Sequence, residues 1–266
     1  MKTEPVGLLF DMVRCAGCRE CIGACMDIHD FKGDPKTVTD LSATAYTSMT
    51  EKDDCSIRNL CRHCIEPSCA SVCPVGALQK TELGPVTYEV DKCIGCRYCM
   101  VACPFNIPRY EWDNPVPAVQ KCDMCIDRLK DGKVPACVEA CDYEATLFGT
   151  RTELLAEARA RIAEDPDDYY DHVYGETEIG GTSVLFLAPK PEEALGYKAI
   201  LGTEPLPGLT LKQLNRVPSI VVGGGAALMA IWWITNRRDE VAATEGRSGT
   251  SSTASGNGKD VHDVWN

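Results

Sequence analysis

Residues 93–104 read Cys93-Ile94-Gly95-Cys96-Arg97-Tyr98-Cys99-Met100-Val101-Ala102-Cys103-Pro104, a run with the spacing C-x2-C-x2-C-x3-C-P. Three thiolates on so short a loop converge on one face, which suits a cubane of four irons and four sulfides. Where two such clusters occur together, the fourth cysteine of the run binds the other cluster. One run therefore predicts a second.

Cysteines occur in three more groups of four. One repeats the spacing without the proline, one has two extra residues before its third cysteine, and one has eleven residues between its second and third members. Their members are Cys15, Cys18, Cys21 and Cys25; Cys61, Cys64, Cys69 and Cys73; and Cys122, Cys125, Cys137 and Cys141. The four groups account for sixteen of the 17 cysteines, and we interpret the remaining one, Cys55, as an ordinary free thiol.

Two other classes of cysteine-rich protein compete with this interpretation. A disulfide framework is typical of small secreted domains with scattered cysteines, not of four tight groups. Zinc is the stronger alternative, because C-x2-C pairs are its usual ligands. A zinc site closed by two such pairs leaves no role, however, for a third cysteine followed by Cys-Pro. The spacing favours iron and sulfide.

The composition indicates a globular protein that does not bind nucleic acid. The chain has 266 residues, is 44% hydrophobic and carries a net charge of -12, which opposes binding to phosphate. Basic residues next to the cysteine groups either offset cluster charge or belong to a solvated surface. They are Arg14, Arg19, Arg62, Arg97, Lys121 and Arg128.

Apolar runs beside the cysteine groups predict an α+β fold with two nested ferredoxin-like units. Val6 to Phe10 and Ala145 to Phe148 are expected to pair and close an outer unit at 1–54 and 110–150. Ala77 to Lys80 and Val86 to Val90 are expected to form a hairpin in a nested unit at 55–109.

The remaining soluble segments have weaker patterns. Residues 30–55 are rich in Thr, Ser and Asp and predict a loop. Residues 151–210 are expected to form a cap and an extended arm: a helix over 153–162 capped by Thr152, a strand over 180–187, and a proline-spaced arm over 189–207.

Val217 to Thr235 contains nineteen uncharged residues, close to the ~20 that a bilayer core requires. Trp232 and Trp233 lie near one end, as interfacial aromatic residues do. We expect a transmembrane helix, whose direction the flanking charges leave open, and then a disordered tail at 240–266. The glycines within the 217–235 stretch also resemble a nucleotide-binding loop. The Gly/Ser/Thr-rich tail that follows, however, offers no second strand for a nucleotide-binding fold.

Motifs for substrate chemistry are absent from the sequence: there is no C-x-x-C-H haem attachment and no P-loop. His63 lies between Cys61 and Cys64, where it either tunes a cluster or is an ordinary loop histidine. We therefore expect a non-catalytic electron-transfer subunit, with electrons entering and leaving through partner subunits.

The four groups, with the expansion in one and the long gap in another, resemble the four-cluster iron-sulfur subunits of membrane-bound respiratory oxidoreductases. The segment from Tyr174 to Leu187 and the single C-terminal span are most similar to the beta subunit of formate dehydrogenase-N and the ferredoxin-like subunit of hydrogenase-2. The resemblance covers roughly residues 5–235. It implies four 4Fe-4S clusters that pass electrons from a catalytic subunit, a formate dehydrogenase or NiFe hydrogenase, toward a quinone-reactive membrane subunit.

The resemblance also implies four ligand sets, named site 1 to site 4 below. Site 1 comprises Cys15, Cys18, Cys21 and Cys141; site 2 comprises Cys25, Cys122, Cys125 and Cys137; site 3 comprises Cys61, Cys64, Cys69 and Cys103; and site 4 comprises Cys73, Cys93, Cys96 and Cys99. Site 1 is then nearest the catalytic subunit and site 4 nearest the membrane.

Residues 1–13 contain neither a twin arginine nor a long apolar core, so we expect no secretory signal there. Hydrogenase-2-type subunits commonly carry such a signal, whereas formate-dehydrogenase-type subunits usually travel folded with a signal-bearing partner. The resemblance thus leans toward the formate side and implies a periplasmic cluster domain on the cell membrane. Two rivals remain: the same electron transfer in reverse, from quinol to a molybdenum reductase, and a zinc-binding structural module.

Overall fold

The computed structural model describes residues 4–197 and 201–248, and the chain divides into two compact units at residues 1–210 and 211–266. All seventeen cysteines lie in the described part of the first unit, and none forms a disulfide. The cysteine chemistry therefore belongs to the first unit.

The first unit is built on a three-stranded sheet with the strand order β8-β1-β9. β1 (Val6–Asp11) pairs antiparallel with β8 (Thr146–Thr150) and parallel with β9 (Val184–Leu187). The predicted pairing of the first apolar run with the run after the last cysteine is confirmed, and a strand does form at the end of the predicted 180–187 segment.

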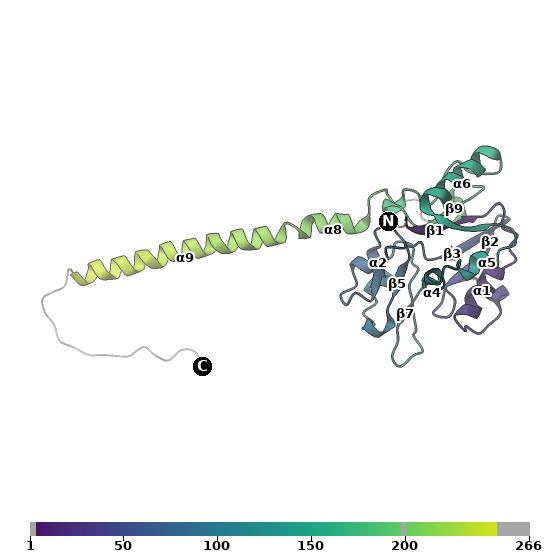
Figure 1. Cartoon of the computed structure of the whole chain (residues 1–266). Helices are drawn as coiled ribbons and strands as arrows, with labels where there is room; N and C mark the ends of the chain where they lie inside the picture. The colour runs from purple at the N-terminus through teal and green to yellow at the C-terminus, as the bar shows by residue number, and fades with distance from the viewer. Residues whose placement is uncertain (1–3, 198–200, 249–266) are drawn as a thin grey trace. The chain divides into compact units, whose positions relative to one another are not determined.

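β1 is apolar without alternation because both faces of the sheet are covered. Leu8 packs into the core that also contains Cys21, whereas Leu9 packs against Leu154 of α6 (Arg151–Glu164) on the opposite face. Figure 1 shows α6 lying along the sheet beside β9. The cysteines and α6 therefore lie on opposite sides of the sheet.

The predicted cap of α6, Thr152, is wrong, because the N-cap is Thr150. The hydroxyl of Thr150 accepts from the amide of Glu153, and the Glu153 carboxylate accepts from the amide of Thr150 at 2.9 Å. This capping box needs an acidic residue three positions after the cap, and only Thr150 has one. The helix continues two residues beyond the predicted 153–162 and ends at Glu164.

A buried ion pair ties α6 to β1. Arg161 Nη1 donates to Asp11 Oδ2 at 2.8 Å, and the hydroxyl of Tyr169 donates to the same oxygen at 2.8 Å. The Arg161 and Asp11 side chains are 3% and 0% exposed. Removing one partner of such a pair leaves an uncompensated buried charge.

We expect the Arg161→Met variant to lose roughly 3–5 kcal/mol of stability, which lowers the melting temperature of a domain this size by roughly 10 °C. The control is Arg159→Met on the same helix, because Arg159 is largely exposed and pairs with Glu176 at the surface. We expect that variant to lose no more than about 1 kcal/mol. Thermal unfolding by circular dichroism measures both, and equal losses would contradict the prediction.

Three hairpins contain all the remaining strands of the described residues. β4 (Leu78–Lys80) and β5 (Val86–Tyr88) form the predicted hairpin. β6 (Arg109–Tyr110) pairs with β7 (Val119–Gln120) around the proline-containing loop at 111–118.

The loop predicted over residues 30–55 is wrong in its second half, where β2 (Thr47–Lys52) pairs with β3 (Cys55–Leu60). Asp53 and Asp54 make the turn with φ of +50° and +63°. A two-residue hairpin turn of type I′ requires positive φ at both positions, which Asp tolerates but signals less clearly than Asn-Gly. Residues 30–46 contain only the short 3₁₀ helix η1 (Pro35–Thr37).

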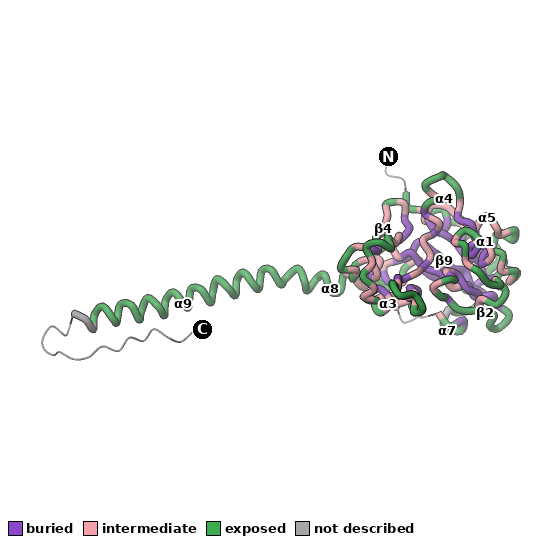
Figure 2. The backbone as a smooth tube through the Cα atoms, turned by 90° about the horizontal axis from the view of Figure 1, so that it is seen from below, coloured by how far each residue is buried: buried purple, intermediate pink, exposed green. Residues whose placement is uncertain are grey.

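Short helices carry the cysteines in two groups. α1 (Glu20–Ile28) packs against α5 (Ala136–Glu139), and α2 (Ser68–Ser71) packs against α3 (Tyr98–Ala102). In two perpendicular views, α1, α5 and β2 lie on one side of the first unit. The opposite side holds the β4–β5 hairpin, with α2 labelled beside it in Figure 1 and α3 in Figure 2. α4 (Ile126–Lys130) follows Cys125.

The predicted extended arm at 189–207 is only partly extended. It contains the one-turn helix α7 (Glu192–Leu195), and α8 (Leu206–Leu214) begins within it. Prolines precede both helices, at positions where their missing N–H groups break no helical hydrogen bond. The 3₁₀ helices η2 (Val90–Lys92) and η3 (Glu178–Gly180) complete the first unit.

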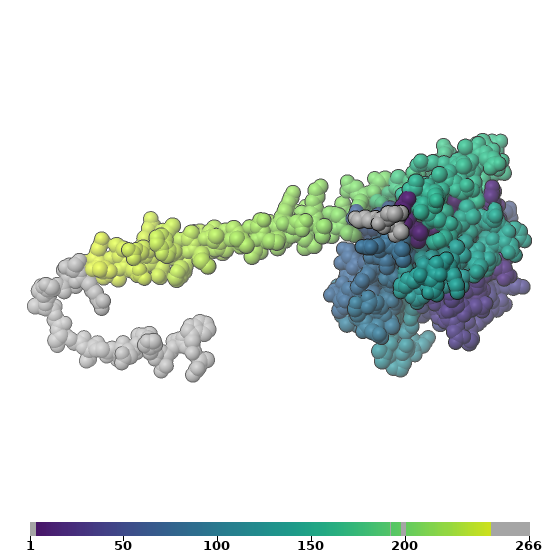
Figure 3. Space-filling view, viewed as in Figure 1, coloured from purple at the N-terminus to yellow at the C-terminus, as the bar shows by residue number. Residues whose placement is uncertain are grey.

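The described part of the second unit is dominated by one helix, α9 (Val217–Ser248), which begins at the predicted residue. It is long and apolar enough to cross a membrane by length and composition, and its apolar window has no buried side chain (Figure 2 and Figure 3). The predicted disorder is wrong for residues 240–248, which continue the helix. Ala and Glu residues added to an existing helix extend it without a new nucleation step. Residues 249–266 lie outside the described residues.

Candidate iron-sulfur sites

Two of the cysteine loops fold alike. In the first loop, Gly17 has φ +68° and Arg19 has φ +66°; in the loop of residues 93–104, Gly95 has φ +68° and Arg97 has φ +61°. The Gly95 amide donates to the first sulfur of its loop at 3.4 Å. Alternating left-handed residues turn successive backbone N–H groups inward, and such concavities bind anionic sulfur.

Sites 1 and 4 each surround a cavity. One is lined by the four cysteines of site 1 with Phe10 and Met49. The other is lined by the four cysteines of site 4 with Leu78 and Val119. The two ends of the cysteine series are therefore similar in apolar surroundings and ligand type.

The thiols expected at site 2 shift one another's pKa values, which shows that they are neighbours. Burial, together with the charge of Cys137, raises the pKa of Cys125 to about 11. Burial also raises the pKa of Cys25 and Cys122, with Cys137 again a neighbour of both. The four cysteines expected at site 2 therefore lie together.

Site 3 shows the same pattern. Burial raises the pKa of Cys64, followed by the charges of Cys61, Cys103 and Cys69. Burial raises the pKa of Cys69 to about 12. Thiols with such values stay protonated at neutral pH, so binding of iron must displace their protons.

The donor set also fits a multi-atom cluster. Among the described residues, no three His, Cys, Asp or Glu side chains converge closely enough to hold a single metal ion. Some buried side-chain atoms have no hydrogen-bond partner in the protein. Within the described residues, all of them belong to residues that fall, in the sequence, between the first and third cysteines of site 3. They are Arg62 Nε and Nη1, His63 Nε2 and Ser68 Oγ. A sulfur-rich cluster accepts hydrogen bonds from such donors.

The four sites form a linear series. Cys21 of site 1 neighbours Cys137 of site 2. Cys122 of site 2 packs in the same apolar cluster as Cys61 of site 3. Cys69 of site 3 packs in the same cluster as Cys99 of site 4. Each site therefore adjoins the next in the order 1, 2, 3, 4.

Comparison with known proteins identifies the family. A model described as a 4Fe-4S dicluster domain matches residues 54–151. The hydrogenase-2 operon protein HybA of Escherichia coli O157:H7 is 39% identical over 235 residues, which cover 71% of this chain and 72% of HybA. The chain belongs to this family of 4Fe-4S iron-sulfur subunits. The nitrate-inducible formate dehydrogenase iron-sulfur subunit of Escherichia coli K12 is 37% identical over 208 residues, 70% of each chain. A protein of Nitratidesulfovibrio vulgaris is 40% identical over 258 residues, 91% of this chain and 70% of that one.

Sequence reasoning about this iron-sulfur subunit missed the buried cation between sites 1 and 2. Arg58 on β3 is 1% exposed, and its side chain donates to the hydroxyls of Thr47 at 2.9 Å and Thr146 at 3.1 Å. Burial by itself lowers the pKa of Arg58, but the charges of Cys21 and Cys137 raise it overall. The sequence signal that could have identified Arg58 is the presence of a charged residue within the mostly buried strand 55–60.

Two of the predicted basic neighbours of the cysteines are buried in the subunit. Arg62 lies 3.8 Å from the ring centre of Phe186 and 4.8 Å from that of Tyr197. Lys121 Nζ donates to the carbonyl of Cys122 at 2.9 Å. Both belong to the cluster surroundings rather than to a solvated surface, whereas Arg19 donates to exposed backbone near Lys36.

His63 is not an ordinary loop histidine, because it is 0% exposed. Burial, followed by the positive charges of Lys121 and Lys80, holds the pKa of His63 well below its usual value. The imidazole is therefore neutral at physiological pH. Lys80 was also missed by sequence reasoning, because it lies on β4, outside the cysteine groups, and only packing brings it beside Cys64 and Cys61.

Cys55 is buried at the start of β3, where its Sγ donates to the carbonyl of Asp53 at 3.5 Å. It packs in the main apolar core with Ile57. This environment agrees with an ordinary structural thiol.

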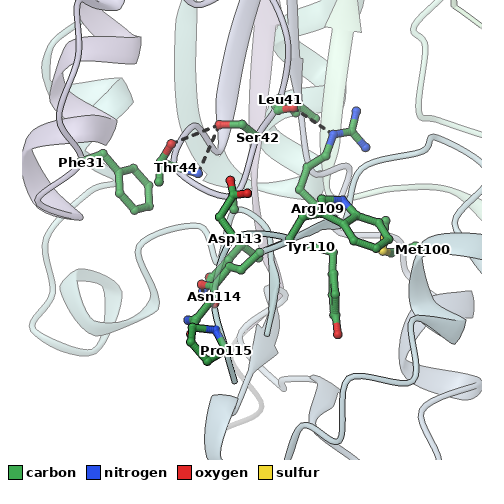
Figure 4. A pocket seen from close by; sticks show the side chains of 14 residues that line it. Phe31, Leu41, Ser42, Thr44, Met100, Arg109, Tyr110, Asp113, Asn114 and Pro115 are labelled. Atoms are coloured by element: carbon green, nitrogen blue, oxygen red, sulfur yellow. Dashed lines mark hydrogen bonds between the residues drawn. The ribbon is translucent and has the colours of Figure 1, made fainter. Parts of the chain in front are cut away.

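A separate hollow opens between the turn at 41–44 and the loop after β6 (Figure 4). Arg109 crosses it, its Nε donating to the carbonyl of Leu41 at 2.9 Å. Its lining contains no cysteine but includes Met100 of α3. The hollow is therefore a groove beside site 4 and not a cluster site.

Proposed function

We propose that this chain is a non-catalytic electron-transfer subunit with four 4Fe-4S clusters, one in each of sites 1 to 4. The linear adjacency of the four sites supports this proposal more strongly than any other observation. A bound cluster supplies one-electron chemistry. The role of the chain is to hold each site next to the following one.

The nested arrangement is part of the same proposal. An outer ferredoxin-like unit would hold sites 1 and 2 on the α1 and α5 side, and a nested unit would hold sites 3 and 4 on the α2 and α3 side. Two packed helix pairs of the same kind, each carrying cysteines, support this division.

The expected partners are a catalytic oxidoreductase subunit and a quinone-reactive membrane subunit. The names of the relatives, which refer to hydrogenase-2 and formate dehydrogenase, support the first, and α9 supports attachment to a membrane. We propose electron flow from site 1 toward site 4 and then to quinone. Reduction of the clusters by quinol, but not by formate or hydrogen, in the purified complex would contradict this direction.

The cluster-bearing unit is proposed to be periplasmic, having been exported folded with a signal-bearing partner. Cluster assembly before export would protect the thiols from oxidation to disulfides. Protease added to spheroplasts should then digest the first unit. Digestion only after the cells are lysed would contradict this location.

The number of clusters is tested by assay of iron, acid-labile sulfide and zinc on the full chain purified without oxygen. We expect about sixteen irons per chain, an equal amount of sulfide and little zinc. Zinc with negligible sulfide would contradict the proposed function and favour a structural zinc module.

A further inference from the structure

His63 is held rigidly beside site 3. Its carbonyl oxygen accepts from the amide of Ser183 at 3.2 Å and from Nζ of Lys80 at 3.1 Å. Its backbone has φ +47°, a left-handed conformation that His and Asn adopt more readily than most residues. Its position in sequence, between two ligands of site 3, and these bonds fix where the imidazole can point.

The hydrogen bond at Nδ1 determines which ring nitrogen carries the proton. The backbone amide of Val86 donates to Nδ1 of His63 at 2.9 Å. An amide N–H is only a donor, so Nδ1 must be the acceptor, carries no proton itself, and leaves the ring proton on Nε2. This Nε2–H is fully buried and has no hydrogen-bond partner within the described residues. A buried donor without a partner is destabilising, which indicates that a bound group accepts this bond.

The surroundings of His63 are those of site 3. Lys80 neighbours both Cys64 and Cys61, and Lys121 neighbours Cys69. The same two lysines are the charged neighbours of the His63 ring. The unpartnered Nε2–H therefore shares its surroundings with three of the four sulfurs of one site.

We propose that Nε2–H of His63 donates a hydrogen bond to a sulfur of the cluster bound at site 3 and raises its reduction potential. This inference rests on the proposed function. A reduced cluster carries one more negative charge than the oxidised form, so a donor to its sulfur stabilises the reduced form more.

Two substitutions separate the donor from the rest of the side chain. In His63→Asn, the carboxamide oxygen replaces Nδ1 as acceptor for Val86 and suits the left-handed backbone, but nothing reaches the position of Nε2. In His63→Gln, the longer carboxamide can place an N–H near that position. The comparison therefore tests the hydrogen bond and not merely the presence of the ring.

The test is a redox titration of the full chain, followed by electron paramagnetic resonance. We expect His63→Asn to make reduction of one cluster about tenfold less favourable, about 59 mV for a one-electron couple, and to leave the other three unchanged. His63→Gln should restore most of the loss. With four clusters still present, unchanged potentials in His63→Asn would overturn the inference.

A second measurement needs no stable variant. In wild-type protein labelled with 15N-histidine, pulsed electron paramagnetic resonance should detect a nitrogen coupled to one reduced cluster. Absence of that coupling would overturn the inference. Iron and sulfide assays on the same sample distinguish this result from failure of the proposed function. A wild-type chain that binds no cluster at site 3 would have fewer than about sixteen irons, and that result would overturn both the proposed function and the inference about His63.

Discussion

Replacement of Cys125 by alanine should remove one cluster and interrupt electron transfer through the subunit. Iron and sulfide should each fall by about four per chain, from about sixteen to about twelve. Cys125 belongs to site 2, which lies between site 1 and site 3 in the linear series. The assembled complex should therefore no longer reduce quinone. The catalytic partner should still reduce an artificial dye that takes electrons from it directly, without passage through this subunit.

The matched control is Cys55→Ala, which removes a buried thiol that belongs to none of the four sites. Its iron, sulfide and quinone reduction should equal those of the wild type. The spectrum of the three remaining clusters in Cys125→Ala shows whether that variant is folded. The ligand assignment would be wrong if Cys55→Ala lost iron, or if Cys125→Ala kept all of it.

Placing two charges in the middle of α9 should release the chain from the membrane. The double substitution Ala226→Asp and Ala227→Asp lies at the centre of the apolar stretch 217–235. Each aspartate there disfavours insertion by about 2.5–3.5 kcal/mol, so the pair opposes it by roughly 5–7 kcal/mol. Carbonate extraction of membranes from cells that express this chain without its partners measures the effect, and we expect most of the protein in the soluble fraction.

The same pair of substitutions can be placed farther along the helix. Ala242→Asp and Ala243→Asp also lie on α9, but beyond the apolar stretch and among charged residues. This variant should remain in the membrane fraction, because its charges need not enter the bilayer core. Equal behaviour of the two variants would show that α9 does not hold the chain in the membrane.

Cysteine spacing alone predicted 4Fe-4S chemistry, because three ligands within seven residues are brought together by the chain itself. The pairing of β1 with β8 was also predictable from the sequence, since two apolar runs flank the first and last cysteine groups. The start of α9 at Val217 follows from the length of the uncharged stretch. The cysteine spacing and the start of α9 depend on local sequence or composition, whereas the long-range pairing of β1 with β8 was predicted from the positions of the two apolar runs.

Only the tertiary structure decided which distant groups meet. In the sequence Arg58 lies next to the cysteines of site 3, yet packing places its charge beside Cys21 of site 1 and Cys137 of site 2. The order of the sites depends on packing such as that of Cys122 against the apolar cluster that contains Cys61, 61 positions apart along the chain. His63 could be called buried, neutral and in need of an acceptor only after Val86 was seen to donate to Nδ1. Such facts depend on long-range packing, which no local spacing records.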